Sequence, residues 1–232
     1  MRSYLNVFLS YRRVLDYSPF LWQPLLQLLI LTSRPFRSGA AYKSIWNEER
    51  SESLLLTSTK DQTGAITKIM QQQYGDSIAV EFCIRYGNPS TKSKVRSLVS
   101  MGCSTILFFP LYPHYAGATS ATATDQLFRA LMNEKWQPSA RTVAPYFDNS
   151  LYIDALAKSV ETAYNKADNK PEILVCSYHG VPRRYLVQGG DPYHCQCQKT
   201  TRLLKERLGW DDTKIVTTFQ SKFGPEEWLK PY

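Results

Sequence analysis

The sequence lacks several features that would quickly assign a protein to a class. Among its 232 residues, no run of Lys or Arg exceeds two residues, although the net charge is +8. No glycine-rich phosphate-binding loop and no nucleic-acid-binding motif occur. No uninterrupted apolar stretch reaches the roughly 20 residues that a membrane-spanning helix needs. The basic excess therefore indicates an anionic partner without selecting one, and nucleic acid is not expected.

Cysteine and histidine are scarce, at five and three residues. An odd number of cysteines in a chain of this size argues against a disulfide framework and favours a reducing compartment. Cys195 and Cys197 form a C-x-C pair. Because no second pair accompanies them, a structural zinc site is not favoured. The apolar fraction of 43% indicates a globular protein.

The most apolar stretch, residues 20–31, is interrupted by Gln23 and Pro24. It begins after Arg12 and Arg13, too late in the chain for a signal peptide. Two interpretations stand. The stretch is either a helix covered by other parts of the protein, or an apolar lip beside an apolar ligand or a membrane surface.

From residue 60 onward, short β-rich runs alternate with helical patterns. Helices are expected over residues 60–73, 91–101, 126–134, 150–166 and 193–208, the last ending at Gly209. Strands are expected over residues 77–83, 104–109, 142–144, 172–177 and 214–219. This alternation predicts an α/β fold in which helices cover both faces of parallel sheets.

The least patterned region, residues 133–149, carries two prolines and predicts a domain boundary. Both ends of the chain look cut, because the sequence starts without an apolar strand and stops directly after one. We expect a fragment of a longer protein. Residues 1–145 would form an N-terminal half without its first strand, and residues 146–232 a truncated C-terminal half.

Three segments follow predicted strands, and ligands of open α/β sheets bind at the carboxyl ends of strands. They are FPLYPHYAGATSATAT (109–124), SYHGVP (177–182) and FQSKFGP (219–225). His179 comes directly after a buried strand, a good position for a base or metal ligand. The surroundings of His114 and His194 favour such a role less. The three segments predict a cleft for a flat, aromatic, anionic ligand; an ordinary helix cap, a structural histidine and a surface loop are the alternatives.

PLYPHYAGATSATATD, SYHGVPRRYLVQGGDPYHCQCQKTTRLL and FQSKFGPEEWLKPY resemble signature segments of the ferrochelatases. The family patterns are PLYPQYS-x-TT, S-x-HG-x-P…GDPY and WQS-x-x-G-x-x-x-WL-x-P. SYRRV, RYGNP and residues 36–56 extend the resemblance over nearly the whole chain. It implies a chelatase-like α/β fold of two flavodoxin-like (Rossmann-type) parallel-sheet halves with a porphyrin cleft between them. It also implies a lyase-class enzyme that inserts Fe²⁺ into protoporphyrin IX to form protohaem, the last step of haem biosynthesis.

The resemblance also assigns roles to single residues. His179 matches the active-site histidine, which ligates the metal or accepts pyrrole protons. The expected substrate-binding residues are Arg85, Tyr115 and Phe219 in the pocket, Tyr42 and Ser53 near the propionates, and Arg34 in a mobile lip. Phe219 stands where many members have Trp, and Leu54 replaces a proline that often follows Ser53.

Some members carry a [2Fe–2S] cluster, held by cysteines of a C-terminal extension and one internal cysteine. The extension is absent here, and Cys195 and Cys197 do not match the internal position, so we expect no cluster and no cofactor; Fe²⁺ is a substrate. The family's second metal-handling residue, a downstream glutamate, is also absent, which implies that this chain alone is nearly inactive.

We expect a protein of the bacterial cytoplasm or of the inner membrane face. A cobalt or nickel chelatase for another tetrapyrrole and a non-catalytic porphyrin- or haem-binding module are the alternatives.

Overall fold

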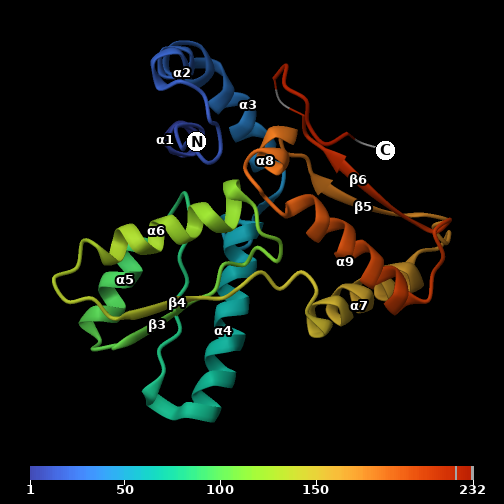
Figure 1. Cartoon of the computed structure of the whole chain (residues 1–232). Coiled ribbons are helices and arrows are strands. Elements are labelled where there is room, and N and C mark those ends of the chain that lie inside the picture. The colour runs from blue at the N-terminus through green and yellow to red at the C-terminus, as the bar shows by residue number, and fades with distance from the viewer. Residues whose placement is uncertain (223, 231–232) are drawn as a thin grey trace. The chain divides into compact units, whose positions relative to one another are not determined.

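The computed structural model describes residues 1–222 and 224–230. The fold is a mixed α/β one that divides into two units (Figure 1). Unit 1 comprises Met1–Phe108 and Thr122–Thr142, and unit 2 comprises Phe109–Ala121 and Val143–Tyr232. Residues 109–121, which we assigned to the N-terminal half from the sequence, thus group with unit 2. The reason is that their main chain is hydrogen bonded to side chains of that unit.

Unit 1 is mainly helical, with two small sheets. Its elements are α1 (Arg2–Leu9), α2 (Pro19–Leu25), the π-helical turn η1 (Leu26–Ile30), α3 (Leu31–Lys43), β1 (Trp46–Asn47), β2 (Glu52–Ser53), α4 (Leu54–Tyr74), the 3₁₀ turn η2 (Gly75–Ser77), α5 (Thr91–Ser100), β3 (Thr105–Phe108), α6 (Thr122–Leu131) and β4 (Ser139–Thr142). Strands β1 and β2 pair antiparallel, whereas β3 and β4 pair parallel.

Helices α5 and α6 cover one face of the β3–β4 sheet. Val95 and Leu127 of these helices pack with Ile106 of β3 in a buried cluster. Side chains alternate between the faces of a strand, so Leu107 points the other way and is 68% exposed. The prediction that helices cover both faces is therefore wrong for this sheet. Both helices pack on the side of Ile106.

The apolar stretch at residues 20–31 lies in a continuous helical segment made of α2, η1 and α3. Trp22, Leu26 and Leu31 are buried, and the Trp22 indole N–H donates to the carbonyl of Leu9 in α1 at 2.7 Å. The opposite side of the segment is exposed and apolar; Phe20 is 90% exposed. The buried side agrees with a helix covered by other parts of the protein, and the apolar lip stays a prediction that concerns the exposed side. Within the described residues, no helix is long and apolar enough to cross a membrane.

Four predicted elements of unit 1 differ from the structure. The helix predicted over residues 126–134 is α6 at Thr122–Leu131, and the strand predicted over residues 142–144 is β4 at Ser139–Thr142. The strand predicted over residues 77–83 does not form with any part of the chain that the structure describes: Ser77 belongs to η2, and the residues after it are extended but unpaired in a sheet. An extended segment becomes a strand only when a neighbour completes its hydrogen bonds. Helix α4 begins at Leu54, six residues earlier than predicted. The Ser53 hydroxyl accepts a hydrogen bond from the Leu56 N–H at 3.2 Å and so caps the helix at this earlier point.

Unit 2 holds a parallel pair of strands and the helices that connect and cover it. Its elements are the π-helical turn η3 (Gly117–Ala121), α7 (Ser150–Lys166), β5 (Leu174–His179), α8 (Arg183–Val187), α9 (Tyr193–Leu208) and β6 (Ile215–Gln220). The bounds of α7 and α9 confirm the predicted helices at 150–166 and 193–208. Gly209 ends α9 with a φ of 65°, as its cap position predicts.

Helices α7 and α9 pack on one face of the β5–β6 sheet (Figure 1). Ala157 of α7, Leu204 of α9 and Ile215 of β6 form the buried cluster. Val175 of β5 points to the other face and is more than half exposed. As in unit 1, the prediction of two covered faces is wrong here.

His114 lies in the interior of unit 2. Its Nε2 is 2.8 Å from the Thr200 hydroxyl oxygen, and the Thr200 hydroxyl donates to the carbonyl of Phe147. Nε2 must therefore carry the proton that it donates to Thr200. Burial lowers the pKa of His114 to about 4, so the ring is neutral near pH 7.

The buried neutral state of His114 predicts acid sensitivity. Below about pH 6.5 the unfolded chain binds a proton at this ring, whereas the folded chain resists protonation down to about pH 4. The free energy of unfolding therefore does not depend on this ring above pH 6.5. It falls by about 3 kcal/mol as the pH drops from 6.5 to 4. Replacement by Gln, whose amide can still donate to Thr200, should remove this dependence. Urea unfolding of the His114→Gln variant and the wild type between pH 7 and 4 measures it. If the difference in the free energy of unfolding between the two proteins did not change with pH, the His114 ring would not be buried and neutral.

Candidate functional site

His179 is the last residue of β5, at the carboxyl end of the parallel pair, as predicted. The side chain is exposed, and its Nδ1 lies 2.7 Å from the carbonyl oxygen of Gly180. A carbonyl can only accept, so Nδ1 carries the proton and Nε2 bears the lone pair. No residue that the structure describes donates a hydrogen bond to Nε2. The ring is thus poised to bind a cation or to accept a proton through Nε2.

The strand ends around His179 are held close together. The Gly180 N–H donates to the carbonyl of Gln220, at the end of β6, at 2.6 Å. A Cβ at position 180 would lie 2.9 Å from the same oxygen and 3.5 Å from the Trp228 ring. Glycine is therefore required if the two strands are to stay paired up to their ends.

The segment after β6 packs on the segment after β5. Pro182 and Trp228 form an isolated bridge, and the Trp228 ring centre lies 6.4 Å from that of His179. Two carboxylates of this segment, Glu226 and Glu227, pair with Arg184 and Arg183 at 3.1 and 2.9 Å, and the Glu227 pair is exposed to solvent. Phe223, from the third predicted segment, lies outside the described residues.

Ser221 is a residue of this site that sequence patterns did not single out. Its φ of 71° places it in the left-handed region, which costs a residue with a side chain about 1–2 kcal/mol. Its hydroxyl donates to the side-chain oxygen of Gln220 at 2.6 Å. Strain of this kind collects at functional sites. The Q-S pair before the Gly-Pro turn was the available signal.

In unit 1, Arg85 is a cation that has no ionic partner among the described residues. Its guanidinium lies 4.5 Å from the ring centre of Tyr11 and 4.2 Å from that of Tyr86. Its three nitrogens are buried and have no hydrogen-bond partner among the described residues. The tyrosine rings attract the positive charge but do not satisfy its N–H groups. The arrangement can accept an anion with oxygen atoms.

A second arginine nearby is fully paired. Arg13 contacts both carboxylate oxygens of Asp125, at 2.7 and 3.2 Å, and the Tyr11 hydroxyl donates to the same carboxylate at 2.7 Å. Burial alone would raise the pKa of Asp125, but the hydrogen bonds from Arg13 and Tyr11 outweigh it and lower that pKa. Burial, with the Asp125 contact, raises the pKa of Tyr11. Tyr11 and Asp125 were missed from the sequence; the SYRRV segment was the signal for Tyr11.

The remaining candidates of unit 1 lie on or beside α3 and α4. Arg34 and Tyr42 are on α3, eight residues or about 12 Å apart along the helix, and both are exposed. Ser53 caps α4 through its oxygen, which leaves its hydroxyl proton to donate. Unit 1 therefore holds Arg34, Tyr42, Ser53 and Arg85, and unit 2 holds the other predicted site residues.

Tyr115 and Phe219 of unit 2 differ in accessibility. The Tyr115 side chain is partly exposed. Phe219 is only 1% exposed, and its ring packs on those of Tyr178 and His194, with centres 6.0 and 5.4 Å apart. Phe219 thus supports its neighbours from within unit 2.

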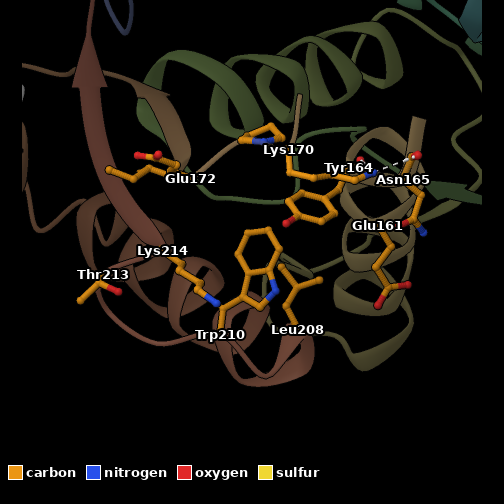
Figure 2. A pocket seen from close by; sticks show the side chains of 11 residues that line it. Glu161, Tyr164, Asn165, Lys170, Glu172, Leu208, Trp210, Thr213 and Lys214 are labelled. Atoms are coloured by element: carbon orange, nitrogen blue, oxygen red, sulfur yellow. Dashed lines mark hydrogen bonds between the residues drawn. The ribbon is translucent and has the colours of Figure 1, made fainter. Parts of the chain in front are cut away.

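A pocket of about 670 Å³ also occurs in unit 2, at the amino ends of β5 and β6 (Figure 2). Its lining includes Tyr164 and Trp210, whose rings pack edge to face at 5.8 Å. The Lys170 ammonium already donates to the carbonyls of Tyr164 and Asn165 at 2.8 and 3.1 Å. The pocket lies at the opposite ends of the strands from His179 and contains none of the predicted site residues.

Within the described part of the chain, no three His, Cys, Asp or Glu side chains cluster so that they could hold a metal ion. The five cysteines are free thiols. Burial raises the pKa of the Cys197 thiol to about 12, so this cysteine is protonated near neutral pH.

Comparison with known proteins gives consistent matches. The family model described as Ferrochelatase matches residues 1–232. The chain is 60% identical over 233 residues to the Ferrochelatase of Rhodobacter capsulatus, covering all of this chain and 66% of that protein. Identity is 48% with the Ferrochelatases of Allorhizobium ampelinum and Rhizobium meliloti, again over the whole chain and over 67% and 68% of those proteins. The chain thus spans about two thirds of the length of these relatives. Because the family model matches its entire length, the chain belongs to the ferrochelatase family.

Proposed function

We propose that this chain takes part in the insertion of Fe²⁺ into protoporphyrin IX to form protohaem. Two pyrrole N–H protons leave the macrocycle as the metal enters, so the reaction needs a group that binds a cation or accepts a proton. The observation that carries the proposal is the geometry of His179. Its Nδ1 proton is committed to Gly180, and its Nε2 lone pair is left open at the carboxyl edge of the sheet.

His179 is assigned the catalytic role in this proposal. A neutral imidazole can accept a pyrrole proton or ligate the incoming ferrous ion, which is a substrate here and not a resident cofactor. The contact with Gly180 fixes the tautomer, so that the same nitrogen always faces the reacting atoms. The Trp228 ring beside it limits the positions that the imidazole can adopt.

Arg85 is assigned to a carboxylate of the substrate. Protoporphyrin carries two propionates, and a guanidinium can donate two parallel hydrogen bonds to one carboxylate. The unsatisfied N–H groups of Arg85 would then be satisfied only when substrate is bound. Arg34, Tyr42 and Ser53 are proposed as further contacts of the propionates, and Tyr115 as an aromatic contact of the macrocycle. Phe219, which is buried, would act only through the rings of Tyr178 and His194 on which it packs.

We also propose peripheral contact with a membrane surface through the exposed side of residues 20–31. Phe20, Leu21, Leu25, Leu28 and Leu29 are exposed there. An apolar helix side of this kind can enter the headgroup layer of a membrane that holds an insoluble substrate. Of the cations that precede this segment, Arg13 is paired with Asp125 and Arg12 lies 3.5 Å from Asp16, so both are less available to anionic headgroups.

The role of His179 is tested by replacing it with Ala. Because the chain spans about two thirds of its relatives, turnover is measured in a graft in which these 232 residues replace the matching segment of the Rhodobacter capsulatus protein. Zinc insertion into a soluble porphyrin should fall at least about a hundredfold, the usual contribution of an acid–base group. Porphyrin affinity should stay within about tenfold, because apolar contacts supply most of it.

Imidazole in solution should partly restore turnover of the His179→Ala graft and leave the wild-type graft unchanged. A variant that keeps more than about a tenth of wild-type turnover without imidazole would exclude His179 as the catalytic group. A wild-type graft that binds porphyrin but does not insert metal would favour a binding module instead.

The role of Arg85 predicts opposite effects on stability and binding. Replacement by Met keeps the apolar stem and removes a buried, unsatisfied cation, so the free energy of unfolding should stay equal or rise. Porphyrin affinity, measured by fluorescence quenching, should fall at least about tenfold through the lost charged hydrogen bonds. Arg141→Met, an exposed arginine of the same unit, is the control. A variant that is less stable and binds porphyrin normally would make Arg85 a structural residue.

Membrane contact is tested with the triple variant Leu25→Ser, Leu28→Ser and Leu29→Ser. Binding to anionic liposomes should weaken at least about tenfold, because three exposed apolar side chains are lost while the buried side of the segment is kept. The control carries Met101→Ser, Met132→Ser and Leu151→Ser, which remove three exposed apolar side chains elsewhere. Equal liposome binding by both variants, or loss of helix content in the first by circular dichroism, would contradict the proposal.

A further inference from the structure

The segment that carries Tyr115 is held by three side chains at the amino-terminal end of α9. These are Asp191, just before the helix, and Gln196 and Thr200 within it. Gln196 and Thr200 are four residues apart, so they lie on the same side of the helix. Together they contact the main chain or the side chains of residues 114–117.

Asp191 makes two hydrogen bonds with different partners. One carboxylate oxygen accepts from the Tyr193 N–H at 3.0 Å, in the first turn of α9. The other accepts from the Gly117 N–H at 2.7 Å, at the start of η3. Asp191 thus joins the start of α9 to the start of η3 through one carboxylate.

Gln196 contacts Tyr115 itself. Its side-chain oxygen accepts from the Tyr115 N–H at 2.7 Å. Ala116, between the two held amides, is buried. The main chain on both sides of the Tyr115 Cα is therefore fixed, while the Tyr115 side chain is partly exposed.

The same end of α9 is also bonded to the segment that follows His179. The Asp191 N–H donates to the carbonyl of Tyr185 at 3.1 Å. The hydroxyl of Tyr178, the residue before His179, lies 3.0 Å from the Thr201 hydroxyl within α9. Helix α9 and the residue before it therefore connect the segments that carry Tyr115 and His179, two residues that we assign to substrate and that both belong to unit 2.

We infer that Asp191 and Gln196 are positioning residues that set Tyr115 relative to His179. The inference rests on the proposed function, because it assigns Tyr115 to the macrocycle. Metal insertion requires that the macrocycle be held in a fixed position at His179. If the segment that carries Tyr115 were mobile, part of the binding free energy would be lost in ordering that segment. Loss of the Gln196 acceptor leaves the Tyr115 N–H without a partner and frees this segment.

The test compares Gln196→Ala with Gln196→Glu, which keeps an acceptor oxygen at the same place. In the graft, Gln196→Ala should raise the KM for porphyrin about five- to tenfold, with kcat changed less than about twofold. Gln196→Glu should return the KM to within about twofold of wild type. Lys199→Ala, which breaks an exposed ion pair of the same helix with Asp148, is the matched control and should change neither parameter.

Amide hydrogen exchange supplies a second measurement that needs no turnover. In the 232-residue chain, Gln196→Ala and Asp191→Ala should each speed exchange over residues 113–121, and Lys199→Ala should not. Faster exchange with an unchanged KM in Gln196→Ala would overturn the positioning role, because the contacts would then serve folding alone. Unchanged exchange would overturn it as well. A wild-type graft that neither binds porphyrin nor inserts zinc would overturn the proposed function first, and the positioning role with it.

Discussion

The parallel pairing of β5 with β6 is the constraint on which unit 2 depends. The register runs unbroken from Leu174 opposite Ile215 to His179 opposite Gln220. Because parallel strands end at the same edge, the chains that leave them must meet there, and Trp228 is brought beside His179. Gly180 keeps the pair closed at its end, since a side chain there would collide with the Gln220 carbonyl. The exposure of the imidazole and the direction of its Nε2 follow from this closure.

Helix α9 connects this edge of the sheet to the rest of unit 2 through its buried side and through its amino-terminal end. Cys197, Thr200, Thr201 and Leu204 are buried along it at helical spacing, and Leu204 packs with Ala157 of α7. Its amino-terminal end instead satisfies main-chain amides of the segment 109–121. A buried amide without a partner is costly, so these polar contacts hold that segment as firmly as apolar packing would. One helix thereby stabilises the core and orders a candidate site.

Unit 1 shows how unequal pairing of charges can prepare a site. Arg13 is ion paired with Asp125, and the Tyr11 hydroxyl donates a hydrogen bond to the same carboxylate. Tyr11 is thereby fixed as a ring against which Arg85 lies. The electron-rich ring faces attract the buried guanidinium but do not accept its N–H groups, which have no hydrogen-bond partner among the described residues. The paired arginine thus supports the unpaired one.

The sequence by itself determined the family and the elements with strong local signals. The ends of α7 and α9 follow from Asn149, whose side chain caps α7, and from Gly209, which needs a left-handed conformation. These signals act within a few residues, so no tertiary information is needed to use them. The position of His179 at the carboxyl end of a strand was predictable for the same reason.

Tertiary structure alone decided which of these residues are open to a ligand. His114 and His179 both follow predicted strands, yet packing buries the first as a neutral donor to Thr200 and leaves the Nε2 of the second exposed. Residues 78–84 have a strand-like composition but no ladder partner in the described chain. Arg85 looks like any other arginine in sequence, and only the fold places it between two rings without an acceptor. Burial, strand pairing and hydrogen-bond satisfaction each depend on groups far away in the chain, and a local pattern does not contain them.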